Sequence, residues 1–157
     1  MSKRDLFWQS IRAEDDKTIA WPAESGARCQ LASKIVGAAV VGAAEHVLRE
    51  ALDRLGGLPP EPGSDGYQAK LHDANVLATL SDEQRQVMGR LLHETAYFSL
   101  YWPLIKVRTL PGLALHLSAT RESAGDTAET FGLTEFLEPH QLLVEWVDEF
   151  GELIDNG

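Results

Sequence analysis

The chain has 157 residues, of which 44% are hydrophobic and 24% are charged, and its formal net charge is −10. This size and composition are typical of one globular domain that buries roughly 70% of its unfolded surface, which argues against wholesale disorder. The strong negative charge disfavours nucleic acids and anionic membranes as partners.

The negative charge is concentrated at one end of the sequence. Residues 122–157 contain ten carboxylates and neither lysine nor arginine, whereas residues 1–57 and residues 58–121 each carry equal numbers of acidic and basic side chains. Ordinary protein surfaces mix the two signs. This asymmetry predicts a basic protein as the partner of the C-terminal segment.

Residues 3–13 have the pattern of a short amphipathic helix, with Leu6 and Ile11 on its apolar side. The N-terminus lacks the apolar core of a secretory signal. The longest low-polarity run, residues 35–44, has ten residues, whereas a membrane-spanning helix needs about 20. We therefore expect no membrane segment and a cytoplasmic location, and the single cysteine, Cys29, fits a reducing compartment.

We expect the longest helix over residues 27–55, where apolar side chains recur at helical spacing until a Gly-Gly pair ends it. Residues 32–44 in its first half are rich in glycine and alanine. Small side chains let another helix approach closely, so we expect a crossing near Gly37 and Gly42. One candidate function follows from this face: a structural homo-oligomer in which residues 32–44 pack against a second copy.

Residues 58–66 are rich in proline and glycine and predict a stiff connection within the domain, followed by a helix over residues 67–79. The sequence Ser-Asp-Glu-Gln that begins at Ser81 has the pattern of a capping box, so Ser81 opens the next helix. That helix is expected to end near Trp102, because Pro103 interrupts it. Its apolar stripe consists of Met88, Leu91, Leu92, Thr95, Phe98, Ser99 and Trp102.

The opposite face of the same helix carries polar and aromatic side chains. Two tyrosines and an arginine on a nominally polar face are typical of binding hot spots. The alternative is that another element packs over them, because large aromatic side chains are usually mostly buried. The residues that we assign to this candidate partner-binding site are Arg90, His93, Tyr97 and Tyr101.

The leucines of residues 113–119 alternate with small or polar residues, which predicts a β-strand, and residues 128–133 are expected to return as its antiparallel partner. This hairpin must lie against the helices, because an isolated hairpin is only marginally stable. The last helix is expected to begin at Pro139. Its expected buried face comprises Leu142, Leu143, Trp146, Val147, Phe150, Leu153 and Ile154.

The other face of the last helix is acidic. An amphipathic helix needs a polar face in any case, so solvation alone is one explanation. However, carboxylates near a helix C-terminus interact unfavourably with the helix macrodipole. This cost indicates that the carboxylates have a function, such as the binding of a partner. We assign the binding of a basic partner to Glu145, Asp148, Glu149 and Glu152.

Histidines and carboxylates on two helices form a candidate metal site. If the two helices are antiparallel neighbours, these groups converge, and the alternative function is a metal-dependent or small-ligand-binding enzyme. The ligand spacings of di-iron bundles and of His-Glu-x-x-His proteins are missing, so we expect no metal or other cofactor. The residues of this candidate site are Glu45, His46, Glu50, His93 and Glu94.

Residues 80–85 (LSDEQR), the helix and strand that follow, and residues 131–135 (FGLTE) resemble a group of small uncharacterised bacterial proteins. Those proteins pair a Leu-Ser/Thr-x-Glu-Gln-Arg helix start with a later Phe-Gly-Thr stretch, and this chain inserts Leu133 between the glycine and the threonine. The resemblance covers residues 75–150. It implies an α+β topology and a bacterial origin, and it carries no activity.

These patterns predict one mostly α-helical domain, residues 1–157, with five or six helices and a small β-hairpin. No catalytic motif is present, and the function that we expect is a non-enzymatic protein-binding module. A small acidic helical protein of this kind resembles bacterial immunity and antitoxin proteins in general character, since those proteins neutralise basic toxins through complementary charge.

Overall fold

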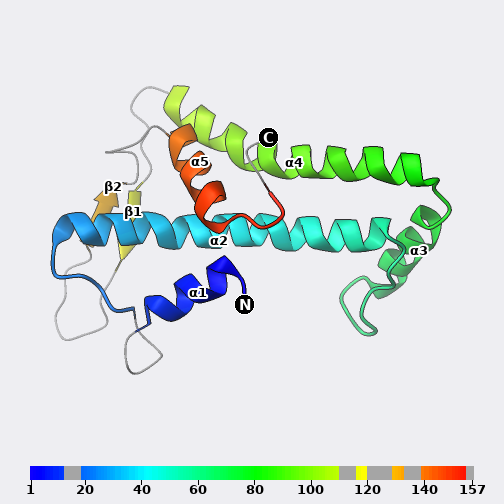
Figure 1. Ribbon diagram of the computed structural model, residues 1–157, viewed down its shortest axis with the longest axis horizontal. Helices are drawn as coiled ribbons and strands as arrows, with labels where there is room; N and C mark the ends of the chain where they lie inside the picture. Colours follow the sequence, from blue (N-terminus) through cyan, green and yellow to red (C-terminus); the bar gives the residue numbers. More distant parts are fainter. Residues whose placement is uncertain (13–18, 110–115, 120–128, 133–138, 155–157) are drawn as a thin grey trace.

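The computed structural model describes residues 1–12, 19–109, 116–119, 129–132 and 139–154 (Figure 1). Within these ranges the chain is mostly helical, as predicted. The elements in chain order are α1 (Lys3–Ser10), α2 (Ser25–Leu55), α3 (Tyr67–Leu77), α4 (Asp82–Thr109), β1 (His116–Ala119), β2 (Glu129–Gly132) and α5 (Pro139–Phe150). Helices α2 and α4 run side by side in opposite directions, with α3 at the end where they are connected and α5 packed against both.

Helix α2 is the central element, and its bounds agree with the predicted helix to within two residues. Over an 18-residue window its mean hydropathy is 1.4, so by length and composition it is the one described helix that could cross a membrane. A helix at the core of a folded domain passes the same test, and α2 contacts α3, α4, α5 and β2. Only 33% of that window is buried within the chain, so the absence of a membrane segment stays a prediction.

The close contact expected at the small residues of α2 occurs at Gly37. Trp146 of α5 lies over this glycine, and a Cβ atom added there would overlap the indole ring. A Cβ atom on Gly42 would instead lie 3.4 Å from the side chain of Arg4 in α1. Within residues 32–44, Ala32, Gly37 and Ala38 are buried inside the chain, whereas Ala39 and Ala43 are exposed.

Helix α4 opens with the predicted capping box. The backbone N–H of Gln84 donates to Ser81 Oγ at 3.2 Å, and that of Ser81 donates to Gln84 Oε1 at 2.8 Å. The expectation that Pro103 interrupts the helix is wrong, because α4 continues through it to Thr109. Proline removes the hydrogen bond to the carbonyl four residues earlier, that of Ser99. Ser99 and Pro103 are both exposed, so water can solvate this carbonyl.

The rotation of α4 about its axis also differs from the expectation. Tyr97 and Tyr101 pack against the hydrophobic core together with Leu92 and Leu100. Most of the apolar stripe of α4 is exposed: Met88, Leu91, Thr95, Phe98, Ser99 and Trp102. Apolar and aromatic residues occur on both faces of α4, so periodicity alone could not decide which face the core covers.

Helix α5 begins at Pro139, as predicted. The helix ends at Phe150, earlier than expected, and the five expected residues that it contains are buried. The other two, Leu153 and Ile154, lie in the segment after it, where Ile154 is buried and Leu153 is half-buried. They form the core with Ala38, Val41 and Leu48 of α2. Helix α1 docks beside α5, and the ring centroids of Phe7 and Phe150 are 5.0 Å apart.

The two strands are short. β1 pairs antiparallel with β2, and His116 lies opposite Gly132. The expected ranges of this hairpin extend to residues 113–115, 128 and 133, which lie outside the described residues. In the connection over residues 58–66, Gly63 and Gly66 have φ values of 86° and 69°, a backbone conformation that favours glycine.

Candidate functional site

The four acidic residues assigned to partner binding lie exposed on α5 and directly after it. Two lysines from other elements reach this surface. Lys34 Nζ of α2 is 2.6 Å from a Glu149 carboxylate oxygen. The backbone N–H of Lys3 donates to the Glu152 carboxylate at 3.2 Å, and its ammonium donates to the Asp148 carbonyl at 3.4 Å. The acidic surface is therefore partly neutralised, and some of its groups hold α1 in place.

The tyrosine-containing face of α4 is turned toward the core. Tyr97 and Tyr101 stack with ring centroids 5.9 Å apart, and burial, followed by the proximity of Tyr101, raises the pKa of Tyr97. His93 Nδ1 lies 2.9 Å from the carbonyl oxygen of Leu153, which only accepts, so Nδ1 carries the proton. Arg90 is exposed. The alternative interpretation, that another element packs over these residues, therefore applies to His93, Tyr97 and Tyr101 and not to Arg90.

The residues of the candidate metal site do not converge. Glu45 is buried, whereas His46 and Glu50 are exposed and lie 3.7 Å apart, from Nε2 to Oε1. His93 is occupied by the Leu153 carbonyl, and Glu94 is exposed. Among the residues that the structure describes, no group of three or more His, Cys, Asp or Glu side chains is placed to hold a metal ion.

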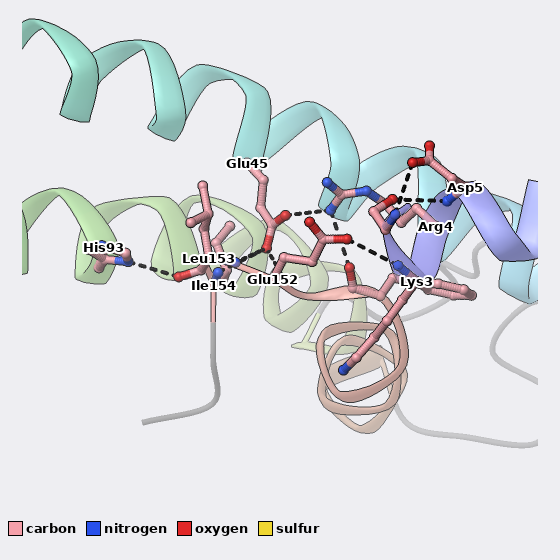
Figure 2. Close-up of polar contacts among 10 residues, drawn as sticks. Lys3, Arg4, Asp5, Glu45, His93, Glu152, Leu153 and Ile154 are labelled. Atoms are coloured by element: carbon pink, nitrogen blue, oxygen red, sulfur yellow. Dashed lines mark hydrogen bonds and ion pairs between the residues drawn. The ribbon is translucent and has the colours of Figure 1, made fainter.

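Glu45 instead joins three helices and the end of the described chain (Figure 2). Its exposed fraction is 0%. Its Oε1 accepts from the backbone N–H groups of residues 152, 153 and 154 at 2.6, 2.6 and 2.9 Å. Its Oε2 accepts from Arg4 Nη1 at 2.5 Å, and the same nitrogen donates to the Phe150 carbonyl at 3.2 Å. Consecutive N–H groups around one oxygen form an anion-binding nest, here filled by the protein's own carboxylate.

The protonation state of Glu45 follows from these contacts. Burial by itself would raise the pKa of the carboxyl group. The N–H groups of Ile154 and Leu153, the Arg4 guanidinium and a further N–H outweigh burial and hold the pKa of Glu45 below its ordinary value of 4.5. Four donors occupy the ionised carboxylate, so we assign it a structural role.

A different surface lies between α2 and α4, on the side turned away from α5. Val41 of α2 faces the core. Around the helix axis, the positions of Val40, Ala43 and Val47 are rotated by roughly a third of a turn or more from it. A groove of about 580 Å³ runs between these residues and α4. Its lining consists of Val40, Ala43, Ala44, Val47, Leu48 and Ala51 from α2, and of Leu92, Thr95, Ala96, Ser99 and Leu100 from α4.

Val47 lines this groove, and three large apolar side chains of α4 lie outside its lining, two of which, Phe98 and Trp102, also contact the Tyr101 ring edge-on. The exposed fractions are 66% for Val47, 53% for Leu91, 45% for Phe98 and 55% for Trp102. We call the surface formed by the groove and these side chains the α2–α4 apolar face. It comprises Val40, Ala43, Val47 and Ala51 of α2 and Met88, Leu91, Thr95, Phe98, Ser99 and Trp102 of α4, and none of these side chains is ionisable.

The sequence contained the signal for this face. Along α4, Met88, Leu91, Thr95, Phe98 and Trp102 are separated alternately by three and four residues. Along α2, Val40, Ala43 and Val47 follow the same spacing. Alternation of three and four is the heptad pattern of helices that pack side by side with other helices. Periodicity therefore identifies the stripe of α4 but does not show whether it faces the chain's own core or solvent.

No protein family, curated protein or solved structure matches this chain. The resemblance to small bacterial proteins over residues 75–150 therefore stays a prediction. Among the residues that the structure describes, the α2–α4 apolar face is a surface on which large apolar side chains are exposed.

Proposed function

We propose that the chain is a non-enzymatic protein-binding module whose docking surface is the α2–α4 apolar face. The observation that carries the proposal is the exposure of Val47, Leu91, Phe98 and Trp102 around an uncharged groove. Together with Met88 they expose on the order of 500 Å² of apolar surface, and continuous patches of this size are often interaction sites.

The chemistry of the face favours an apolar helix as its partner. A charged peptide would have to bury its charges in this groove without a counter-charge, which is unfavourable. A helix with its own apolar stripe fits the groove between two helices and matches the spacing of Leu91, Thr95 and Phe98. The partner that we propose is therefore a helical protein segment with an uncharged apolar face.

Site-specific photo-crosslinking in the cells that express the protein tests this proposal. A photoreactive phenylalanine analogue is placed at Phe98 in one sample and, as a matched control, at His46, which is exposed on another face of α2. We expect a discrete protein adduct from position 98 and none from position 46, with the crosslinked peptide of the partner lying in a helix. Equal adducts at both positions, or none at position 98, would contradict the proposal.

A basic protein bound by the acidic residues of α5 is the second candidate. It is supported by the absence of lysine and arginine from residues 122–157 and by the exposure of Glu145, Asp148, Glu149 and Glu152. Such a partner would give the protein the character of an immunity protein or antitoxin. The contacts made by Lys34 and Lys3 reduce the net charge of this surface, so we rank it second.

A further inference from the structure

We propose that the occupant of the α2–α4 apolar face is the same face of a second copy of this chain. The two α2–α4 pairs then form a four-helix arrangement about a two-fold axis. This inference depends on the proposed function and names its partner.

The α2–α4 apolar face carries two apolar stripes. One stripe lies on α2, from Val40 to Val47, and another on α4, from Met88 to Trp102. A single partner helix seated in the groove would leave the outer side of one stripe exposed. Two adjacent helices cover both stripes, and an α2–α4 pair is such a unit, because its two stripes share the same spacing of three and four residues. Packing of this kind, at small crossing angles, is that of four-helix bundles.

The two sides of the face differ in shape. The α2 side of the groove is lined by small residues, among them Ala43, Ala44 and Ala51. The α4 side carries a ridge of large residues, Leu91, Phe98 and Trp102. In a two-fold arrangement the same patch is used on both copies, so the ridge of each copy can lie on the small residues of the other. The face is thus complementary to itself.

Electrostatic repulsion between two copies depends on where the charges of the chain lie. A net charge of −10 on each copy opposes association, but the exposed carboxylates of α5 lie on the other side of the α2–α4 pair. The titratable residues at the edge of the face are of both signs: Glu50, Arg54, Arg90 and Glu94. Repulsion at the interface itself is therefore small.

The available area sets the expected affinity. The exposed apolar area, on the order of 500 Å² on each copy, is smaller than the roughly 800 Å² that each partner buries in a standard interface. We therefore expect reversible association with a dissociation constant on the order of micromolar.

Sedimentation equilibrium of the purified chain over about 1 to 200 µM tests the inference. The wild-type mass should rise from 17.3 kDa toward twice that value. Leu91→Glu and Phe98→Glu, each at an exposed position, should weaken association at least about tenfold, because each places a charge in the interface. Leu6→Glu on α1 is the matched control, since Leu6 is also large and half exposed, at 51%, and it should leave the mass unchanged.

Folding and partner identity are followed separately. Far-UV circular dichroism and an unchanged dilute-solution Tm show that each variant is folded, and Val47→Glu repeats the test from α2. A wild-type mass of 17.3 kDa at every concentration would overturn self-association, as would an equal effect of Leu6→Glu. If the chain stays monomeric and position 98 still crosslinks to another protein, the proposed function stands without this inference. If it is monomeric and position 98 gives no adduct, both fail.

Discussion

Two residues of α2, only two positions apart, reverse the usual distribution of charge and hydrophobicity. Glu45 is fully buried, whereas Val47 is two-thirds exposed. The glutamate is stable inside because three backbone N–H groups and Arg4 satisfy it. The valine has no such explanation within the described chain. The comparison indicates that one side of α2 is completed by the chain itself, while the other side is left for a partner.

The largest expected effect concerns the completed side. Glu45→Ala should lower the free energy of unfolding by about 3–5 kcal/mol, because it leaves Arg4 and several buried N–H groups without their partner. Chemical denaturation measures the change. Glu50→Ala, at an exposed position on the same helix, should cost less than about 1 kcal/mol. Equal losses of unfolding free energy in the two variants would show that the hydrogen bonds of Glu45 do not stabilise the fold more than an exposed glutamate does.

The packing of α5 on α2 gives the next effect. Gly37→Ala should cost about 1–3 kcal/mol, because the new methyl group overlaps the Trp146 ring. Gly26→Ala in the first turn of α2 is the matched control. There the added Cβ would meet only a Glu24 carboxylate oxygen at 3.9 Å, so stability should be unchanged or slightly higher. Thermal unfolding of both variants decides whether α5 lies where we describe it.

The ionisation of Glu45 should also appear in the pH dependence of stability. Its pKa is lowered in the folded state, so its contribution is complete well above the ordinary value of 4.5 and is lost as the pH falls through the folded-state pKa. The difference in unfolding free energy between the wild type and Glu45→Gln should therefore shrink below about pH 4.5. A difference that stays constant between about pH 7 and pH 3 would mean that the buried group is not ionised.

The smallest effect on stability is expected at the acidic surface of α5. Replacing Glu145, Asp148, Glu149 and Glu152 with glutamine should leave the helix intact, because Trp146 and Phe150 hold its other face. Only modest losses, at most about 1 kcal/mol per pair, are expected from the Lys34 and Lys3 contacts. If a basic protein binds here, stopped-flow kinetics should show slower association with little change in dissociation. Unchanged association at low salt would leave this surface without a binding role.

Local patterns in the sequence predicted much of the fold. The capping box at Ser81, the start of α5 at Pro139 and the buried face of α5 follow from residues within a few positions of one another. The burial of Glu45 does not, because its donors lie 41 residues before it and at least 107 residues after it. The periodicity of α4 also could not predict which of its faces is buried. Tyr97 and Phe98 are neighbours in sequence, and both faces carry residues that can make apolar contacts.

The candidate sites were predicted less well for the same reason. Histidine and carboxylate spacing suggested a shared site for Glu45 and His93, but each is occupied by groups of the turn after α5. The α2–α4 apolar face was visible as a stripe in the sequence of α4. Its exposure follows from the position of α5, which packs against the opposite side of the helix pair.

Hydroxyl-radical footprinting of the unmodified chain at increasing concentration tests the central claim most directly. Met88, Phe98 and Trp102 belong to the α2–α4 apolar face and react readily with hydroxyl radicals, while Met1, which is highly exposed, serves as the internal control. We expect the oxidation rates of the three face residues to fall several-fold between about 1 and 200 µM, the range in which micromolar association saturates, while the Met1 rate stays constant. Rates at Met88, Phe98 and Trp102 that do not change with concentration, or that change in parallel with Met1, would contradict the account.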